Sequence, residues 1–192
     1  MTFPSFSVGE TLRAADMNAV GMWHLGTFTA SGTSRALICD NIFTSDYDNY
    51  RVVLRMNSTI QTNAFFYQYL DTNGNSVTSG YYGTVYNQDY ASATTGFIGT
   101  LAANTVQYIG YLPNSGGGAS MLSASFDIFQ PRLSTIATAI VGSQTGISSG
   151  AYFAGGQIMG QMTNSTAHRG LRFDNGGAGN LTGVVRVYGY RN

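Results

Sequence analysis

Residues 50–56 read Tyr-Arg-Val-Val-Leu-Arg-Met, and this stretch decides the class of fold. Val52, Leu54 and Met56 would face a core, whereas Arg51 and Arg55 would face solvent, which is the alternation of a half-buried β-strand. Residues 121–129 repeat the pattern, with an apolar side chain at every even position from 122 to 128. The two stretches predict antiparallel sheet with one face on a core and one in solvent.

Working outward from these stretches, short apolar runs separated by turn signals predict a sheet protein along the rest of the chain. Asn73-Gly74 between two aromatic-rich runs indicates a tight hairpin turn. We expect an all-β fold, an antiparallel β-sandwich of jelly-roll type, formed as one domain by residues 24–192. The predicted strands are 24–30, 35–43, 50–58, 64–71, 78–86, 96–101, 106–112, 120–129, 134–142, 151–161, 168–174 and 182–190.

The composition is poor in charge. Charged residues make up 9% of the 192 residues, against about 25% in ordinary domains, and no Lys occurs. Gly, Ser, Thr and Asn take their place, which favours turns and neutral surfaces. A net charge of zero protects a solitary monomer poorly, so we expect a member of a large assembly, although a genome-wide bias against Lys explains the same numbers. The neutral balance predicts no nucleic-acid partner.

No membrane insertion or export is expected. No apolar stretch reaches the roughly 20 residues of a membrane span. The first residues lack the basic region and apolar core of a signal peptide, so we expect the protein to stay in a cytoplasm until assembly.

Residues 1–23 differ from the rest because they show no strand periodicity. Residues 12–20 carry apolar side chains at helical spacing, which predicts one or two helical turns before Gly21. A helix that short is marginal in water unless it docks on something. We therefore interpret residues 1–23 as an anchoring arm, whose contact residues would be Phe3, Phe6, Leu12, Ala15, Asp16, Met17, Asn18 and Trp23.

Candidates for chemistry are few. The single cysteine, Cys39, lies in an apolar run and is expected to be buried and inert. The two histidines, His24 and His168, stand near no evident nucleophile. Asp46 and Asp48 are the nearest pair of carboxylates, and turn capping explains them better than glycoside cleavage does. We expect no catalytic residues, no metal site and no cofactor.

Two further features leave alternatives open. The run that starts at Asp71 resembles the start of a calcium loop, but no Glu follows at the required spacing and a hairpin explains the same residues. A tyrosine cluster combines stacking surfaces with hydroxyl groups, which suits core packing, a subunit contact or glycan binding. Packing or a trimer contact is favoured over glycan binding. The cluster consists of Tyr81, Tyr82, Tyr86 and Tyr90.

Two motifs carry a resemblance. The run Gly9-Glu-Thr-Leu-Arg-Ala-Ala-Asp-Met-Asn18 resembles the N-terminal motif of tail fibre and appendage proteins of tailed bacteriophages, except that Arg13 replaces a helix-capping Thr. The run Phe43-Thr-Ser-Asp-Tyr-Asp-Asn-Tyr50, together with the ending Tyr188-Gly-Tyr190, is similar to a β-sandwich module of phage virion proteins.

The resemblance implies a virion structural protein and no enzyme. The protein would be a tail fibre or appendage, attached through its arm to other virion proteins, trimeric, and active in host attachment. A capsid decoration (cement) protein that stabilises the head shell fits an arm without a shaft equally well. A small spike that cuts host polysaccharide is the third alternative.

Overall fold

In the described part of the chain the protein is all-β, with two antiparallel sheets and no helix. The computed structural model describes residues 21–59, 63–89, 95–98, 105–113, 121–147, 153–164 and 166–190. The large sheet has the order β6 (Thr95–Ile98), β5 (Tyr81–Asp89), β10 (Phe153–Met162), β9 (Thr138–Ile147), β8 (Leu122–Phe129), β3 (Asn49–Ser58), β12 (Leu181–Tyr190) and β1 (Met22–Ser31). The small sheet has the order β7 (Gln107–Leu112), β4 (Asn63–Leu70), β11 (Gly170–Asn175) and β2 (Ala36–Cys39).

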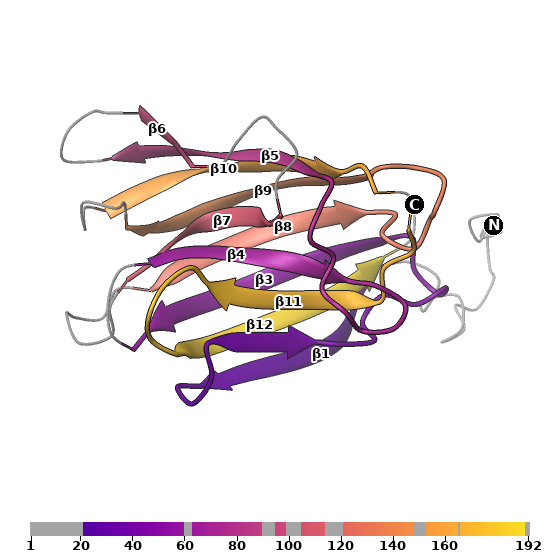
Figure 1. Cartoon of the computed structure of the whole chain (residues 1–192), viewed down its shortest axis with the longest axis horizontal. Helices are drawn as coiled ribbons and strands as arrows, with labels where there is room; N and C mark the ends of the chain where they lie inside the picture. Colours follow the sequence, from indigo (N-terminus) through magenta and orange to yellow (C-terminus); the bar gives the residue numbers. More distant parts are fainter. Residues whose placement is uncertain are drawn as a thin grey trace, which may run out of the picture.

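The two sheets form two layers that meet along one side. A single residue pair, Tyr111 of β7 with Ile147 of β9, links their hydrogen-bonded orders. In Figure 1, β4 and β11 lie in front of β3, β8 and β12. Most connections carry the chain from one layer to the other, so strands that follow each other in sequence are seldom partners. β12, for example, pairs with β1 and β3.

The core lies between the layers and is built from aromatic and branched side chains. The ring of Tyr67 in β4 stacks on that of Phe126 in β8, with the ring planes 4° apart and the centroids 5.6 Å apart. Val52, Leu54 and Met56 are at most 1% exposed, while Arg55 is exposed, as the alternation in residues 50–56 predicts. Burial of these apolar surfaces is the main stabilising contribution to the two-layer arrangement.

All twelve predicted strands occur, and two of them change their bounds substantially. The segment predicted over 35–43 forms a strand only as β2, because Asn41 adopts a φ of 53° and turns the chain. The segment predicted over 134–142 begins later, as β9, because residues 132–137 form an exposed connection after Gln130, whose φ is 55°. Ile136, an apolar residue within the predicted span, is exposed in that connection.

The first strand also begins earlier than expected. β1 starts at Met22, so the predicted boundary at residue 23 falls inside the strand. The predicted helical turns over 12–20 lie outside the described residues.

Candidate functional site

Trp23, predicted as part of an anchoring arm, belongs to the sheet. It lies in β1 opposite Gly189 of β12, and its ring centroid is 6.0 Å from that of Tyr47. The other predicted contact residues of the arm lie outside the described residues: Phe3, Phe6, Leu12, Ala15, Asp16, Met17 and Asn18. An arm that anchors the protein would therefore end before Met22.

The corner before β3 packs on the end of β12. The Tyr47 ring lies over Gly189, where an added Cβ would come within 2.5 Å of the ring. The Tyr50 hydroxyl accepts a hydrogen bond from the Thr44 amide at 2.8 Å and donates to the Thr44 carbonyl at 2.9 Å. Two motifs more than 130 residues apart thus form one aromatic joint, beside Trp23. Residue spacing alone gave no sign of this contact.

The tyrosine cluster divides between core and surface. Tyr81 is 1% exposed, and its hydroxyl accepts from the Tyr69 amide at 2.7 Å and donates to the Val77 carbonyl at 3.0 Å. Tyr81 is therefore a core residue and cannot contact a glycan. Tyr82 and Tyr86 lie on β5 with their side chains half-buried, on the side opposite to Tyr81. Tyr90 lies outside the described residues.

Cys39 and His168, residue types that could serve as nucleophile and base, are both buried in the core. Cys39 is fully buried, and this burial raises the pKa of its thiol well above the ordinary value. His168 is also fully buried, with its ring stacked on Tyr69 at a centroid distance of 4.4 Å. Neither of its ring nitrogens has a hydrogen-bond partner in the described part of the chain. Burial lowers the pKa of His168 to about 4, so the ring is neutral at pH 7.

The carboxylates serve turns and ion pairs. Asp71 accepts hydrogen bonds from the amides of Asn73 and Asn75 at 2.9 and 2.8 Å, as in a tight turn. The predicted hairpin is wrong beyond this turn: Leu70 forms a bridge with Ser76, but β4 pairs with β7 and β11 whereas β5 pairs with β6 and β10 in the other sheet. Asp40 is paired with Arg169, whose hydrogen bond holds the pKa of that carboxyl below its ordinary value. Asp46 and Asp48 are both exposed in the corner before β3. Within the described residues, no group of three or more metal-binding side chains occurs.

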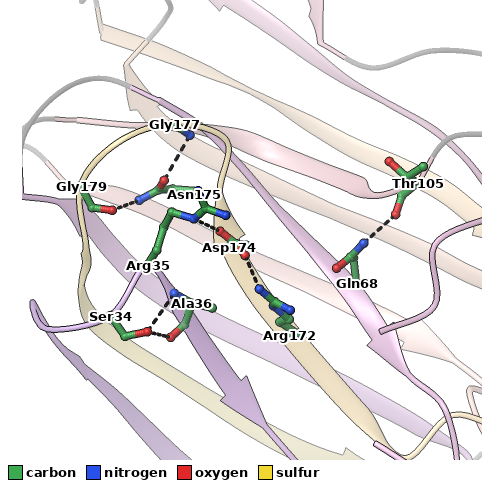
Figure 2. A network of polar contacts seen from close by, with 10 residues as sticks. All are labelled: Ser34, Arg35, Ala36, Gln68, Thr105, Arg172, Asp174, Asn175, Gly177 and Gly179. Carbon is green, nitrogen blue, oxygen red and sulfur yellow. Dashed lines mark hydrogen bonds and ion pairs between the residues drawn. The ribbon is translucent and has the colours of Figure 1, made fainter. Parts of the chain in front are cut away.

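The outer face of the small sheet carries a group of ion pairs and hydrogen bonds around β11 (Figure 2). Asp174 of β11, only 7% exposed, accepts from Arg172 Nη2 at 2.8 Å and faces Arg35 Nε at 3.3 Å. The neighbouring Asn175 donates to the Gly179 carbonyl at 2.7 Å and accepts from the Gly177 amide at 3.2 Å. The hydrogen bonds of Asn175 stabilise the turn between β11 and β12, and the charge of Asp174 is compensated by two arginines.

The outer face of the large sheet is different, because small side chains leave it hollowed at two places. One hollow, of about 350 Å³, lies over β3, β8 and β9, and its outward side chains include Arg55, Ser125 and Thr145. The other, of about 340 Å³, lies over β5, β10 and β9, between Tyr82 and Met159. Both are open and shallow, so they suit a ligand that lies on the sheet better than one enclosed by it.

Comparison with known proteins returned no match, either to family models, to curated proteins or to solved structures. Among the described residues, no helix is long and apolar enough to cross a membrane.

Proposed function

We propose that the chain is a structural protein of a bacteriophage virion, a tail fibre or tail appendage that takes part in host attachment. Residues 1–21 would attach it to other virion proteins, with the short helix docked on the particle. The two-layer domain would be exposed at the surface as a homotrimer. Assembly would take place in the host cytoplasm.

The main support for the proposal is the aromatic joint, the packing of Tyr47 on Gly189 at the end of β12 and on Tyr50 at the start of β3. Residues 43–50 and 188–190, the two segments that resemble the phage β-sandwich module, meet where the Tyr47 ring covers Gly189. Within the first segment, the Tyr50 hydroxyl is hydrogen-bonded to the Thr44 backbone. The segment that resembles the tail-fibre motif precedes this joint directly, since β1 begins at Met22. Residues 43–50 and 188–190 are thus parts of one local structure, and the segment that resembles the tail-fibre motif lies before β1 in the sequence.

The strand order gives further support. Four strands of one layer, in the order β1-β12-β3-β8, face four of the other in the order β2-β11-β4-β7. We interpret these eight strands as a jelly roll, in which β5 and β6 form one insertion and β9 and β10 another. Jelly rolls are common in viral shells and in lectins, but a fold alone does not fix a function.

Antibody against the purified chain, applied to phage particles and imaged by electron microscopy, would test the proposal. Label at the tail, with a few to tens of copies per particle by quantitative mass spectrometry, is the expected result. Hundreds of copies over the head would instead identify a capsid decoration protein. Complete absence from purified particles would refute a virion role.

Deletion of residues 2–20 tests the anchor separately. We expect the shortened chain to give the circular dichroism spectrum of the intact β-domain but to be missing from particles. Normal incorporation of the shortened chain would show that the anchor lies elsewhere.

A further inference from the structure

The middle of the large sheet's outer face is lined by hydroxyl groups. Ser123 and Ser125 of β8 and Ser143 and Thr145 of β9 stand in register, Ser125 opposite Ser143 and Ser123 opposite Thr145. Their small side chains form the floor of the hollow of about 350 Å³. Serine is depleted at protein–protein contacts, whereas a hydroxyl-lined hollow can donate and accept hydrogen bonds with a hydroxyl-rich ligand.

One wall of this hollow is positively charged. Arg55 lines it, and Arg186 stands opposite Val53, which lines it as well. Arg55 and Arg186 are diagonal neighbours across β3 and β12, a placement with Cβ atoms somewhat less than about 7–8 Å apart. Both are exposed, and within the described residues no carboxylate pairs with either.

Arg51, on the same strand as Arg55, differs because it is paired with a carboxylate. Its guanidinium is bound by both oxygens of Asp127, at 2.9 and 2.7 Å, so its charge is already compensated. The unpaired charge of this face therefore concentrates at Arg55 and Arg186, next to the hydroxyl floor. A guanidinium is suited to carboxylate because it can donate two parallel hydrogen bonds.

The second hollow continues the same face toward the edge strands. Its outermost strand, β5, is the fourth strand from β3, a distance of about 19 Å at the usual strand spacing. Tyr82 borders it, with Gln161 directly opposite on β10. The half-buried ring of Tyr82 offers a stacking surface, and the amide of Gln161 offers a donor and an acceptor. A ligand that uses both hollows must be an extended chain.

We propose that this face binds an acidic polysaccharide, with its carboxylates at Arg55 and Arg186, its hydroxyl groups over the serine floor and one ring against Tyr82. The inference rests on the proposed role in host attachment and names the class of receptor. The competing occupant, a second copy of this chain, would also bring carboxylates to the arginines, and the experiment below distinguishes the two.

The experiment uses the purified full chain and isothermal titration calorimetry. The probes are polygalacturonate, alginate and polysialic acid, each paired with its methyl-esterified form. We expect at least one acid polymer to bind, with affinity falling at least tenfold on esterification and falling again as NaCl rises from 50 to 300 mM. Arg55→Gln and Arg186→Gln should each weaken binding by about fivefold. Arg132→Gln, an equal change of charge on the exposed connection before β9, should leave binding unchanged.

A second variant, Ser125→Tyr, fills the hollow, and its oligomeric state is measured by analytical ultracentrifugation. Lost binding with an unchanged oligomer supports the proposal, whereas dissociation of an oligomer identifies the face as a subunit contact and overturns it. The proposal is also overturned if no acid polymer binds, or if the esterified forms bind equally well. Such a failure would leave the virion role intact, since that role is tested by the location of the chain in particles.

Discussion

The buried histidine provides the sharpest test of the fold. His168 must stay neutral while its ring is stacked on Tyr69, and its pKa falls from the ordinary 6.5 to about 4. Between these two pH values the unfolded chain binds a proton that the folded chain does not, so stability falls as the pH falls. At about 1.4 kcal/mol per pH unit, the whole difference amounts to about 3 kcal/mol, of which about 2 kcal/mol is lost between pH 7 and 4.5.

Urea unfolding at several pH values from 7.0 to 4.5, followed by far-ultraviolet circular dichroism, measures this loss. The His168→Phe variant keeps a ring on Tyr69 but cannot titrate, so its free energy of unfolding should change by less than about 0.5 kcal/mol over that range. His24→Gln, a change at an exposed histidine, should retain the slope of the wild-type protein. The range ends above the pH at which Asp40 and Asp71 titrate, because hydrogen bonds hold both pKa values below the ordinary 3.8.

A wild-type stability that stays constant from pH 7.0 to 4.5 would refute the reasoning. An unchanged slope in His168→Phe would do the same, because the protons would then bind elsewhere. If that variant proves too unstable to study, the ring carbon shifts of His168 in the wild-type protein, followed by NMR, give the pKa directly. A midpoint near 6.5 would show that the ring is solvated in the folded state.

The remaining predictions concern packing, and each is measured as a free energy of unfolding at pH 7. Gly142→Ala places a Cβ against the β8 backbone and should cost about 3 kcal/mol, whereas Gly155→Ala, whose nearest neighbour would lie 3.6 Å away, should cost less than about 1 kcal/mol; equal costs would contradict the register of β8 and β9. Tyr50→Phe removes the hydroxyl that closes the corner before β3 and should cost about 1–2 kcal/mol, and a neutral effect would mean that the corner holds without it. Tyr81→Ala should cost about 3–5 kcal/mol and Tyr82→Ala, on the half-buried outer face, about 1 kcal/mol; the reverse order would exchange the two faces of β5.

Local patterns predicted the strands well because apolar and polar residues alternate between the core face and the solvent face of each half-buried strand. The alternation in residues 50–56 and 121–129 identified the core side chains of β3 and β8 directly. For adjacent residues such as Tyr81 and Tyr82, the same rule requires opposite faces but does not say which is buried. That depends on β4, whose Tyr69 amide donates to the Tyr81 hydroxyl.

The surroundings of His168 and the arginine pair on the large sheet depend on contacts between distant segments, which cannot be predicted from a local pattern. The apolar surroundings of His168 come from Tyr69, which lies 99 residues earlier. Arg55 and Arg186 became neighbours only through the pairing of β3 with β12. The strand predicted over 134–142 began too early, because the backbone turns at Gln130 and residues 132–137, Ile136 among them, are exposed.

The position of β12 between β1 and β3 has a consequence during synthesis. β1 and β3 are finished when Ser58 has been added, but the strand that joins them begins only at Leu181. At about 5–20 residues per second, the ribosome needs on the order of ten seconds to bridge that interval. During this time two ten-residue strands have open edges and apolar faces. The nascent chain is thus the most aggregation-prone form of the protein, and we expect its yield to depend on chaperones and on temperature more than the stability of the finished domain suggests.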